Sequence, residues 1–280
     1  MDALTPTNTY GNDPALRRAP NGLAYREIGH GRPLLLLHGL MASGEMFEPL
    51  VERLRDGFRM LIPDLRGHGA SGDLAGPYDS AGMARDVLRV MDEAGFQHGL
   101  VLGYSHGGTV AQELARARPS VVDGLFLTCT YACNTMSARE RIEGRVLLAL
   151  HTVLSPRTLA KAIVRQGPSL GDMTDEQVRW LRAIIGQNGR RQMRGAVRDG
   201  LLGFDSRPWL KTISAPTLVI GGSGDMAVPH HHFEMMVSTI PGARGREIEG
   251  AGHALMWTHT DQLASIVRSQ ALAWSGDANA

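Results

Sequence analysis

Short apolar runs alternate with amphipathic stretches along the first half of the chain. The run at 34–37 consists of four leucines between Pro33 and His38, which is typical of a strand buried on both faces. The stretches between such runs carry apolar residues at helical spacing. The pattern predicts strands at about 34–37, 58–62, 99–102 and 121–128, and helices at about 44–54, 80–93 and 109–117.

This alternation indicates an α/β protein with a parallel sheet covered by helices on both faces. Between about residues 134 and 206, three or four amphipathic helical segments follow one another without a convincing strand. One of them opens at Thr174, where Thr174-x-x-Gln177 has the form of a capping box. The other helices are expected at about 139–154 and 191–202 and, once the alternation resumes, at about 228–239 and 255–274, with strands at about 216–220 and 246–248.

The chain is therefore expected to divide into three parts. Residues 1–20 read as a loose lead-in, residues 21–133 and 207–280 as an α/β core, and residues 134–206 as a helical cap. In open parallel sheets, ligands bind at the carboxyl ends of the strands. We expect the cap to lie over that edge.

Composition and charge narrow the classes of partner. The 280 residues are 43% hydrophobic and carry a formal net charge of +1, which gives no electrostatic reason to expect nucleic acid or an anionic membrane. Cys129 and Cys133 form neither a zinc box nor a disulfide framework, so we expect two free thiols in a reducing compartment. With no secretory signal and no apolar run long enough to cross a bilayer, the protein is expected to be soluble and cytoplasmic.

One five-residue turn carries the chemistry. The sequence Gly103-Tyr104-Ser105-His106-Gly107 follows an apolar strand and opens a helix, which is the context of a nucleophile elbow. Such a turn strains its central residue and needs small neighbours, and the glycines supply them. We expect the Ser105 hydroxyl to be exposed at the end of the strand as a nucleophile.

A serine nucleophile needs a base, and the base needs a carboxylate that orients it. Among 11 histidines, His253 lies in a glycine-rich loop after the last strand and follows the serine in chain order. Asp225 comes just after the strand expected at 216–220, whereas the preceding strand ends at Thr128-Cys129-Thr130-Tyr131 without an acid. We predict Ser105, Asp225 and His253 as a catalytic triad.

The remaining candidates surround this triad. Two backbone N–H groups should hold the oxyanion, one from His106 and one from the loop after residues 34–37, where we expect Leu40, with Met41 as the alternative. Met41, Phe47 and Tyr104 are expected to line the substrate pocket.

Three consecutive histidines, at 230–232, are residue types that bind metals. Adjacent residues on a helix point to different faces, so we expect a surface cluster there and no metal site.

Taken in chain order, these motifs resemble the α/β-hydrolase superfamily over residues 22–275. Within the superfamily, the pattern is similar to small capped bacterial carboxylesterases and enol-lactonases. The resemblance implies the same triad and no cofactor. Dehalogenases and epoxide hydrolases of this fold use an aspartate nucleophile, which disfavours both here. The motifs that carry the resemblance are His38-Gly39, Asp64-x-Arg66-Gly67-x-Gly69-x-Ser71, Gly103-x-Ser105-x-Gly107-Gly108, Asp225-x-x-x-Pro229 and Gly252-His253.

The sequence thus predicts a serine hydrolase that cleaves a small to medium, fairly apolar ester or lactone through an acyl-enzyme. Three alternatives remain open: a carbon–carbon bond hydrolase, a cofactor-free oxygenase in which His253 is the base, and a slow-turnover protein that binds a ligand. The expected partner is a small molecule.

Overall fold

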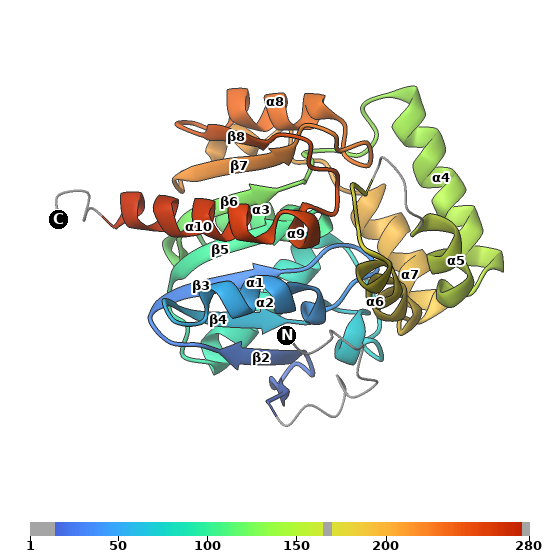
Figure 1. The fold of residues 1–280 in the computed structure, drawn as a ribbon. Coiled ribbons are helices and arrows are strands. Elements are labelled where there is room, and N and C mark those ends of the chain that lie inside the picture. The colour runs from blue at the N-terminus through green and yellow to red at the C-terminus, as the bar shows by residue number, and fades with distance from the viewer. Residues whose placement is uncertain (1–14, 165–169, 276–280) are drawn as a thin grey trace.

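The computed structural model describes residues 15–164 and 170–275, and it contains a sheet of eight strands in the order β1-β2-β4-β3-β5-β6-β7-β8 (Figure 1). The pairs β1–β2 and β2–β4 are antiparallel, and all the other pairs are parallel. The strands are β1 (Arg17–Arg18), β2 (Ala24–Ile28), β3 (Arg32–Leu37), β4 (Phe58–Pro63), β5 (Gly99–Tyr104), β6 (Val122–Thr128), β7 (Thr217–Gly222) and β8 (Arg244–Ile248).

Both faces of this sheet are covered, because successive side chains of a strand point to opposite faces. On β3, Leu34 and Leu36 belong to one buried apolar cluster, and Leu35 and Leu37 belong to the other. Figure 1 shows α1 and α10 in front of the sheet, where they pack in the first cluster. Residues of α2, α3 and α8 pack in the second cluster. The helices are α1 (Glu48–Leu54), α2 (Ser80–Glu93), α3 (His106–Ala117), α8 (His230–Thr239), α9 (Leu255–Thr258) and α10 (Thr260–Trp274).

Between β6 and β7 the chain forms four α-helices, with no strand among the described residues from 134 to 206. The capping box predicted at Thr174 and Gln177 is present at the start of α6. The segment leaves and rejoins the sheet at one place, because Cys133 and Asp205 form an antiparallel bridge and the Ser206 N–H donates to the Ala132 carbonyl at 2.8 Å. These helices, grouped to one side of the sheet in Figure 1, are α4 (Ala138–Val153), α5 (Pro156–Ile163), α6 (Asp175–Gly186) and α7 (Arg190–Ala196).

The structure confirms the predicted α/β fold and differs from the sequence pattern mainly at the sheet edge. Most of the predicted lead-in, residues 1–14, lies outside the described residues, but Arg17–Arg18 form β1 and Ala19 is buried. Strand β2 was not predicted, because the polar pair Arg26-Glu27 interrupts its apolar pattern. Arg26 is nevertheless buried, and it pairs with Glu48 of α1.

Two helices also differ from expectation. The helix expected at 255–274 breaks at His259 into α9 and α10, and α5 follows a serine cap, Ser155, that the apolar pattern did not reveal. No helix in the described part of the chain is long and apolar enough to cross a bilayer.

Candidate active site

Ser105 lies in a tight turn between β5 and α3, with φ 52° and ψ −121°. A non-glycine residue at positive φ is strained by about 1–3 kcal/mol and persists only where its surroundings hold it. Here the Ser105 N–H donates to the Thr128 carbonyl at 2.9 Å, and the Thr130 hydroxyl donates to the Ser105 carbonyl at 2.6 Å. The adjoining strand end therefore fixes the turn from both sides.

The turn also depends on close backbone approach at its glycines. A Cβ on Gly107 would overlap the Leu37 carbonyl, and a Cβ on Gly108 would overlap the Thr130 side chain. The small residues that the sequence pattern required are thus those that let α3 pack directly on the strand ends.

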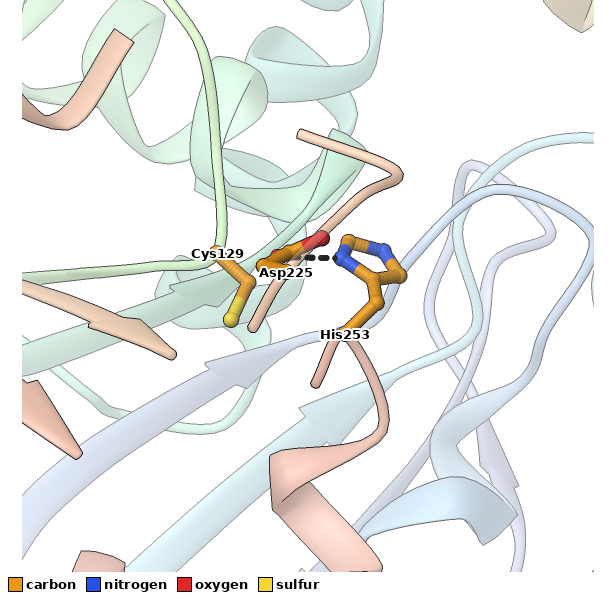
Figure 2. Close-up of side chains that lie close together, drawn as sticks. All are labelled: Cys129, Asp225 and His253. Carbon is orange, nitrogen blue, oxygen red and sulfur yellow. Dashed lines mark hydrogen bonds and ion pairs between the residues drawn. The ribbon is translucent and has the colours of Figure 1, made fainter. Parts of the chain in front are cut away.

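The structure brings Ser105, His253 and Asp225 together, with His253 between the other two. Its Nε2 lies 3.2 Å from Ser105 Oγ, and its Nδ1 lies 2.8 Å from Asp225 Oδ2. Figure 2 shows the His253 ring turned edge-on toward the carboxylate. With the proton on Nδ1 donated to Asp225, Nε2 is free to accept the serine proton, which is the arrangement a general base requires.

Asp225 is itself held by the backbone. Its Oδ1 accepts hydrogen bonds from the Ala227 and Val228 N–H groups, both at 2.9 Å. Burial alone would raise the pKa of Asp225, but the His253 charge and the hydrogen bonds from His253, Val228 and Ala227 together bring that pKa below its usual value. The carboxylate is therefore ionised at neutral pH and oriented before any substrate arrives.

The structure adds Cys129 to this group (Figure 2). It follows β6 at φ 46°, is buried, and lies against Asp225. Burial, then the Asp225 charge, raises the pKa of the Cys129 thiol well above its usual value, so the thiol is neutral. Donor atoms of Cys129, Asp225 and His253 lie within 4.8 Å of one another, which a metal ion could exploit only by displacing the His253–Asp225 hydrogen bond.

The two predicted oxyanion donors face one cavity. Leu40, Met41 and His106 all line it, and in the described part of the chain none of their backbone N–H groups donates a hydrogen bond. His106 begins α3, so its N–H also lies at the positive end of the helix dipole. Leu40 and Met41 both remain candidates for the second donor.

Two residues that the sequence did not indicate, Asn188 and His151, contact Met41 in the loop after β3. Met41 has a φ of 62°, and its carbonyl accepts a hydrogen bond from Asn188 Nδ2 at 2.7 Å. The same amide accepts a bond from the Gly69 N–H at 3.1 Å. His151 Nε2 lies 3.3 Å from the Met41 sulfur. Both residues come from the helical segment more than 100 positions away, so no local motif could reveal them.

A cavity of about 260 Å³ opens beside Ser105, between the strand ends and the helical segment. Aliphatic and aromatic side chains make up most of its wall. Tyr104 and Met41 are among the residues that line it, and the Tyr104 hydroxyl donates to the His253 carbonyl. The residues that the helical segment contributes are Asn134, Leu147, Ile163, Val164, Leu170, Leu181, Ile185 and Leu201.

Phe47 was predicted at the pocket and is not there. It ends the 3-10 turn Gly44–Phe47, which directs its ring into the core cluster beneath α1, and it is fully buried. The apolar spacing that placed Phe47 near the site did not reveal which face of the turn points inward.

His106 is fully buried, and burial lowers its pKa to about 3. Its imidazole is therefore neutral, and Gly200 packs directly against the ring. These contacts fit a packing role for the side chain.

A mostly parallel sheet with a strained serine turn at the carboxyl end of one strand defines a class of protein, the α/β-type hydrolases. A profile of the alpha/beta hydrolase fold matches residues 32–260. The chain belongs to the α/β-hydrolase fold family.

Relatives of known type agree with this assignment. The chain is 31% identical over 257 residues to the pimeloyl-(acyl-carrier protein) methyl ester esterase of Xanthomonas campestris pv. campestris, covering 86% of this chain and 95% of that protein. A thermophilic esterase from Thermogutta terrifontis superposes with a TM-score of 0.81 at 26% identity, covering 93% and 97% of the two chains. The enol-lactonase from Burkholderia xenovorans shares the fold, with a TM-score of 0.80 at 24% identity over 91% and 98%.

Proposed function

We propose that the protein hydrolyses carboxylic esters or lactones through an acyl-enzyme on Ser105. The observation that carries this proposal is the relay of Ser105, His253 and Asp225, with separations of 3.2 and 2.8 Å at the edge of the cavity. A nucleophile, a base within hydrogen-bond reach and an orienting carboxylate are the parts that acyl transfer by a serine requires.

The proposed reaction has two halves. Ser105 Oγ attacks the carbonyl carbon while His253 Nε2 takes the hydroxyl proton, and this proton then passes to the leaving alcohol as the ester bond breaks. In the second half, a water molecule gives its proton to His253 and attacks the acyl group. The acid is released, and the proton returns to Ser105.

Charge develops on the carbonyl oxygen in both halves. The His106 N–H and the N–H of Leu40 or Met41 are the proposed donors for it, since they face the cavity without other partners among the described residues. A single such donor contributes a factor of about 10²–10³ in rate. Asp225, which stays ionised, stabilises the imidazolium that forms in each half.

The cavity favours a fairly apolar acyl group. Its wall contains few polar side chains, and we propose that residues 134–206 act as a cap that closes it over the substrate. Similarity to an esterase and to an enol-lactonase fold supports either a linear ester or a lactone as substrate. A volume of about 260 Å³ suits a small to medium acyl chain.

The test is the hydrolysis of p-nitrophenyl acetate, butyrate and octanoate by the wild type and by Ser105→Ala. We expect the alanine variant to lose at least about 10³-fold in kcat, because the nucleophile is gone. Ser238→Ala, an exposed serine of α8, is the matched control and should keep full activity. Mass spectrometry of the quenched wild type should detect the acyl group on Ser105.

Retention of activity by Ser105→Ala would refute the proposal. Equal rates in air and under nitrogen would separate ester hydrolysis from the oxygenase alternative, since hydrolysis consumes no O₂. Tight binding of a lactone without release of its hydroxy acid would instead indicate a ligand-binding protein.

A further inference from the structure

A second group of chemically active side chains lies outside the active site, where α4 meets α8. It consists of Glu140, His231 and His232. The sequence predicted a surface cluster at the three histidines, and this prediction was wrong for His232, which is fully buried. At the first turn of α8, both His231 and His232 reach the carboxylate of Glu140.

Their donor atoms converge on one oxygen. Glu140 Oε1 lies 2.8 Å from His231 Nε2 and 3.1 Å from His232 Nε2. The other oxygen, Oε2, accepts the Ser137 N–H at 2.9 Å in the capping box that begins α4. The helix cap therefore fixes the carboxylate with Oε1 presented to the two rings.

Hydrogen bonding satisfies only part of this cluster. His232 Nε2 is hydrogen-bonded to Oε1. His231 Nε2 is also buried and close to Oε1, but among the described residues it makes no hydrogen bond. Buried polar nitrogens are nearly always paired, so an unpaired one that faces a carboxylate calls for a third participant.

The donor atoms suit a cation. The cluster brings one carboxylate oxygen and two imidazole nitrogens within 4.8 Å of one another. Carboxylate oxygen and imidazole nitrogen are the atoms that proteins use to ligate zinc-type ions.

We propose that Glu140, His231 and His232 bind one divalent transition-metal ion of the zinc type, with water completing the coordination. Imidazole nitrogen and carboxylate oxygen are the ligands such ions take, with bonds of about 2.0–2.2 Å. A tetrahedral site with these bonds separates its donors by about 3.3–3.6 Å. The observed carboxylate–imidazole separations of 2.8 and 3.1 Å are shorter than this, so the carboxylate would have to move away from the rings by up to about 0.8 Å to admit the ion.

The proposed metal site lies between the helical segment and the α/β core. Glu140 belongs to the first helix of the 134–206 segment, and the two histidines belong to α8 on the sheet. His232 also packs edge-to-face on Tyr131, which lines the cavity. A bound ion would tie the helical segment to the core beside the substrate cavity. This inference stands independently of the proposed esterase activity.

The experiment is a calorimetric titration of tag-free, metal-stripped protein with Zn²⁺, repeated with Co²⁺ while recording visible absorption. We expect one tight site in the wild type and the d–d bands of a nitrogen- and oxygen-ligated Co²⁺. His231→Ala is the main variant, because the side chain is 39% exposed and its loss should leave the fold intact. His230→Ala is the matched control, since this histidine pairs with Glu234 and Glu247 instead.

The expected result is that His231→Ala weakens Zn²⁺ binding by at least about tenfold, because losing even an outer-sphere partner costs 10–100-fold. His230→Ala should bind as the wild type does. Glu140→Gln keeps a side chain that can close the capping box but lacks the charge, so it should also bind more weakly. In the wild type and in His230→Ala, Zn²⁺ should raise Tm, and in His231→Ala it should not.

Equal binding by His231→Ala and His230→Ala would overturn the proposal. The comparison is insensitive to ions held at Cys129, Asp225 and His253, because that group is intact in both variants. Absence of a tight site in the folded wild type would overturn the proposal equally.

Discussion

Each residue of the Ser105 relay is held by a contact outside the relay, Ser105 and His253 through their backbone and Asp225 through its side chain. Ser105 is fixed through Thr130, and Asp225 through the backbone of the residues that follow it. The carbonyl of His253 accepts a hydrogen bond from the hydroxyl of Tyr104, the residue just before Ser105. Such second contacts hold the relay in position in the free protein, which is how an acyl-transfer site limits reorganisation during the reaction.

At the scale of one residue, replacing Asp225 with asparagine removes the negative charge of the side chain while keeping its size. The amide side chain would keep the size of the carboxylate but would favour the wrong His253 tautomer and leave the imidazolium uncompensated. We expect kcat for p-nitrophenyl butyrate to fall by about 10⁴-fold in Asp225→Asn. Asp123→Asn, at a surface pair with His98, is the control and should stay active. Loss of less than about tenfold in Asp225→Asn would place the catalytic acid elsewhere.

At the scale of elements, α3 begins so close to the strand ends that its first turn tolerates no side chain at Gly107. A Cβ there would overlap backbone oxygens of Leu37 and His38, which cannot rotate away. The Leu40–Met41 loop, the proposed source of the second oxyanion donor, follows one residue later, so we expect a displacement at Gly107 to reach Leu40.

Gly107→Ala is therefore expected to lower the free energy of unfolding by about 1–3 kcal/mol or more and to impair catalysis. Gly57→Ala is the matched control, because a Cβ at Gly57 meets nothing within 4 Å. Urea unfolding of the two variants measures the difference. Equal stability would contradict the close packing of α3 on β3.

A second relation between elements joins the end of α6 to the Leu40–Met41 loop, the proposed source of the second oxyanion donor, through Asn188, which lies two residues after this helix. Asn188→Ala removes the donor to the Met41 carbonyl while leaving the triad in place. We expect kcat to fall by about 10–100-fold with a smaller change in KM, since small displacements of catalytic groups are costly.

Thr174→Ala is the control for this prediction, because it removes the N-terminal cap of α6, the helix that precedes Asn188, and costs about 1 kcal/mol without touching the Leu40–Met41 loop. It should keep its kcat. If Asn188→Ala only lowers stability and leaves the kcat of the folded protein unchanged, Asn188 does not position the loop.

At the scale of the whole molecule, buried histidines make the fold sensitive to acid. Burial lowers the pKa values of His38 and His232 to about 4 and those of His68 and His106 to about 3, from 6.5. Below pH 6.5 the unfolded chain binds protons that the folded chain does not. The free energy of unfolding must therefore decrease as the pH is lowered. The loss continues until the pH reaches the folded pKa values.

Each such histidine contributes a slope of up to about 1.4 kcal/mol per pH unit, and the four together contribute up to about 5.5 kcal/mol per unit below about pH 5.5. Urea unfolding between pH 7 and 5 should detect this decline. His68→Gln should reduce the slope by about a quarter, because one of the four titrating groups is gone. A slope that does not change in this variant would mean that His68 is protonated in the folded state.

The sequence alone carried much of the fold. Alternating apolar runs predicted the parallel strands and most helices, since burial on both faces demands continuous apolar residues. It also indicated Ser105, Asp225 and His253, because each follows a strand, and parallel strands end at one edge. The structure brings these three together, and their catalytic roles remain the proposal tested above.

Only the tertiary structure decided which distant residues meet. Asn188 and His151 reach Met41 across more than 100 residues, and Glu140 lies beside His231 and His232 because α4 packs near the start of α8. Periodicity gives the buried face of an element but not the partner that covers it, which is also why Phe47 lies in the core rather than the cavity. Local pattern determined the elements and the order of the reactive residues, whereas packing between elements determined the cavity, the contacts that hold the Leu40–Met41 loop and the proposed metal site.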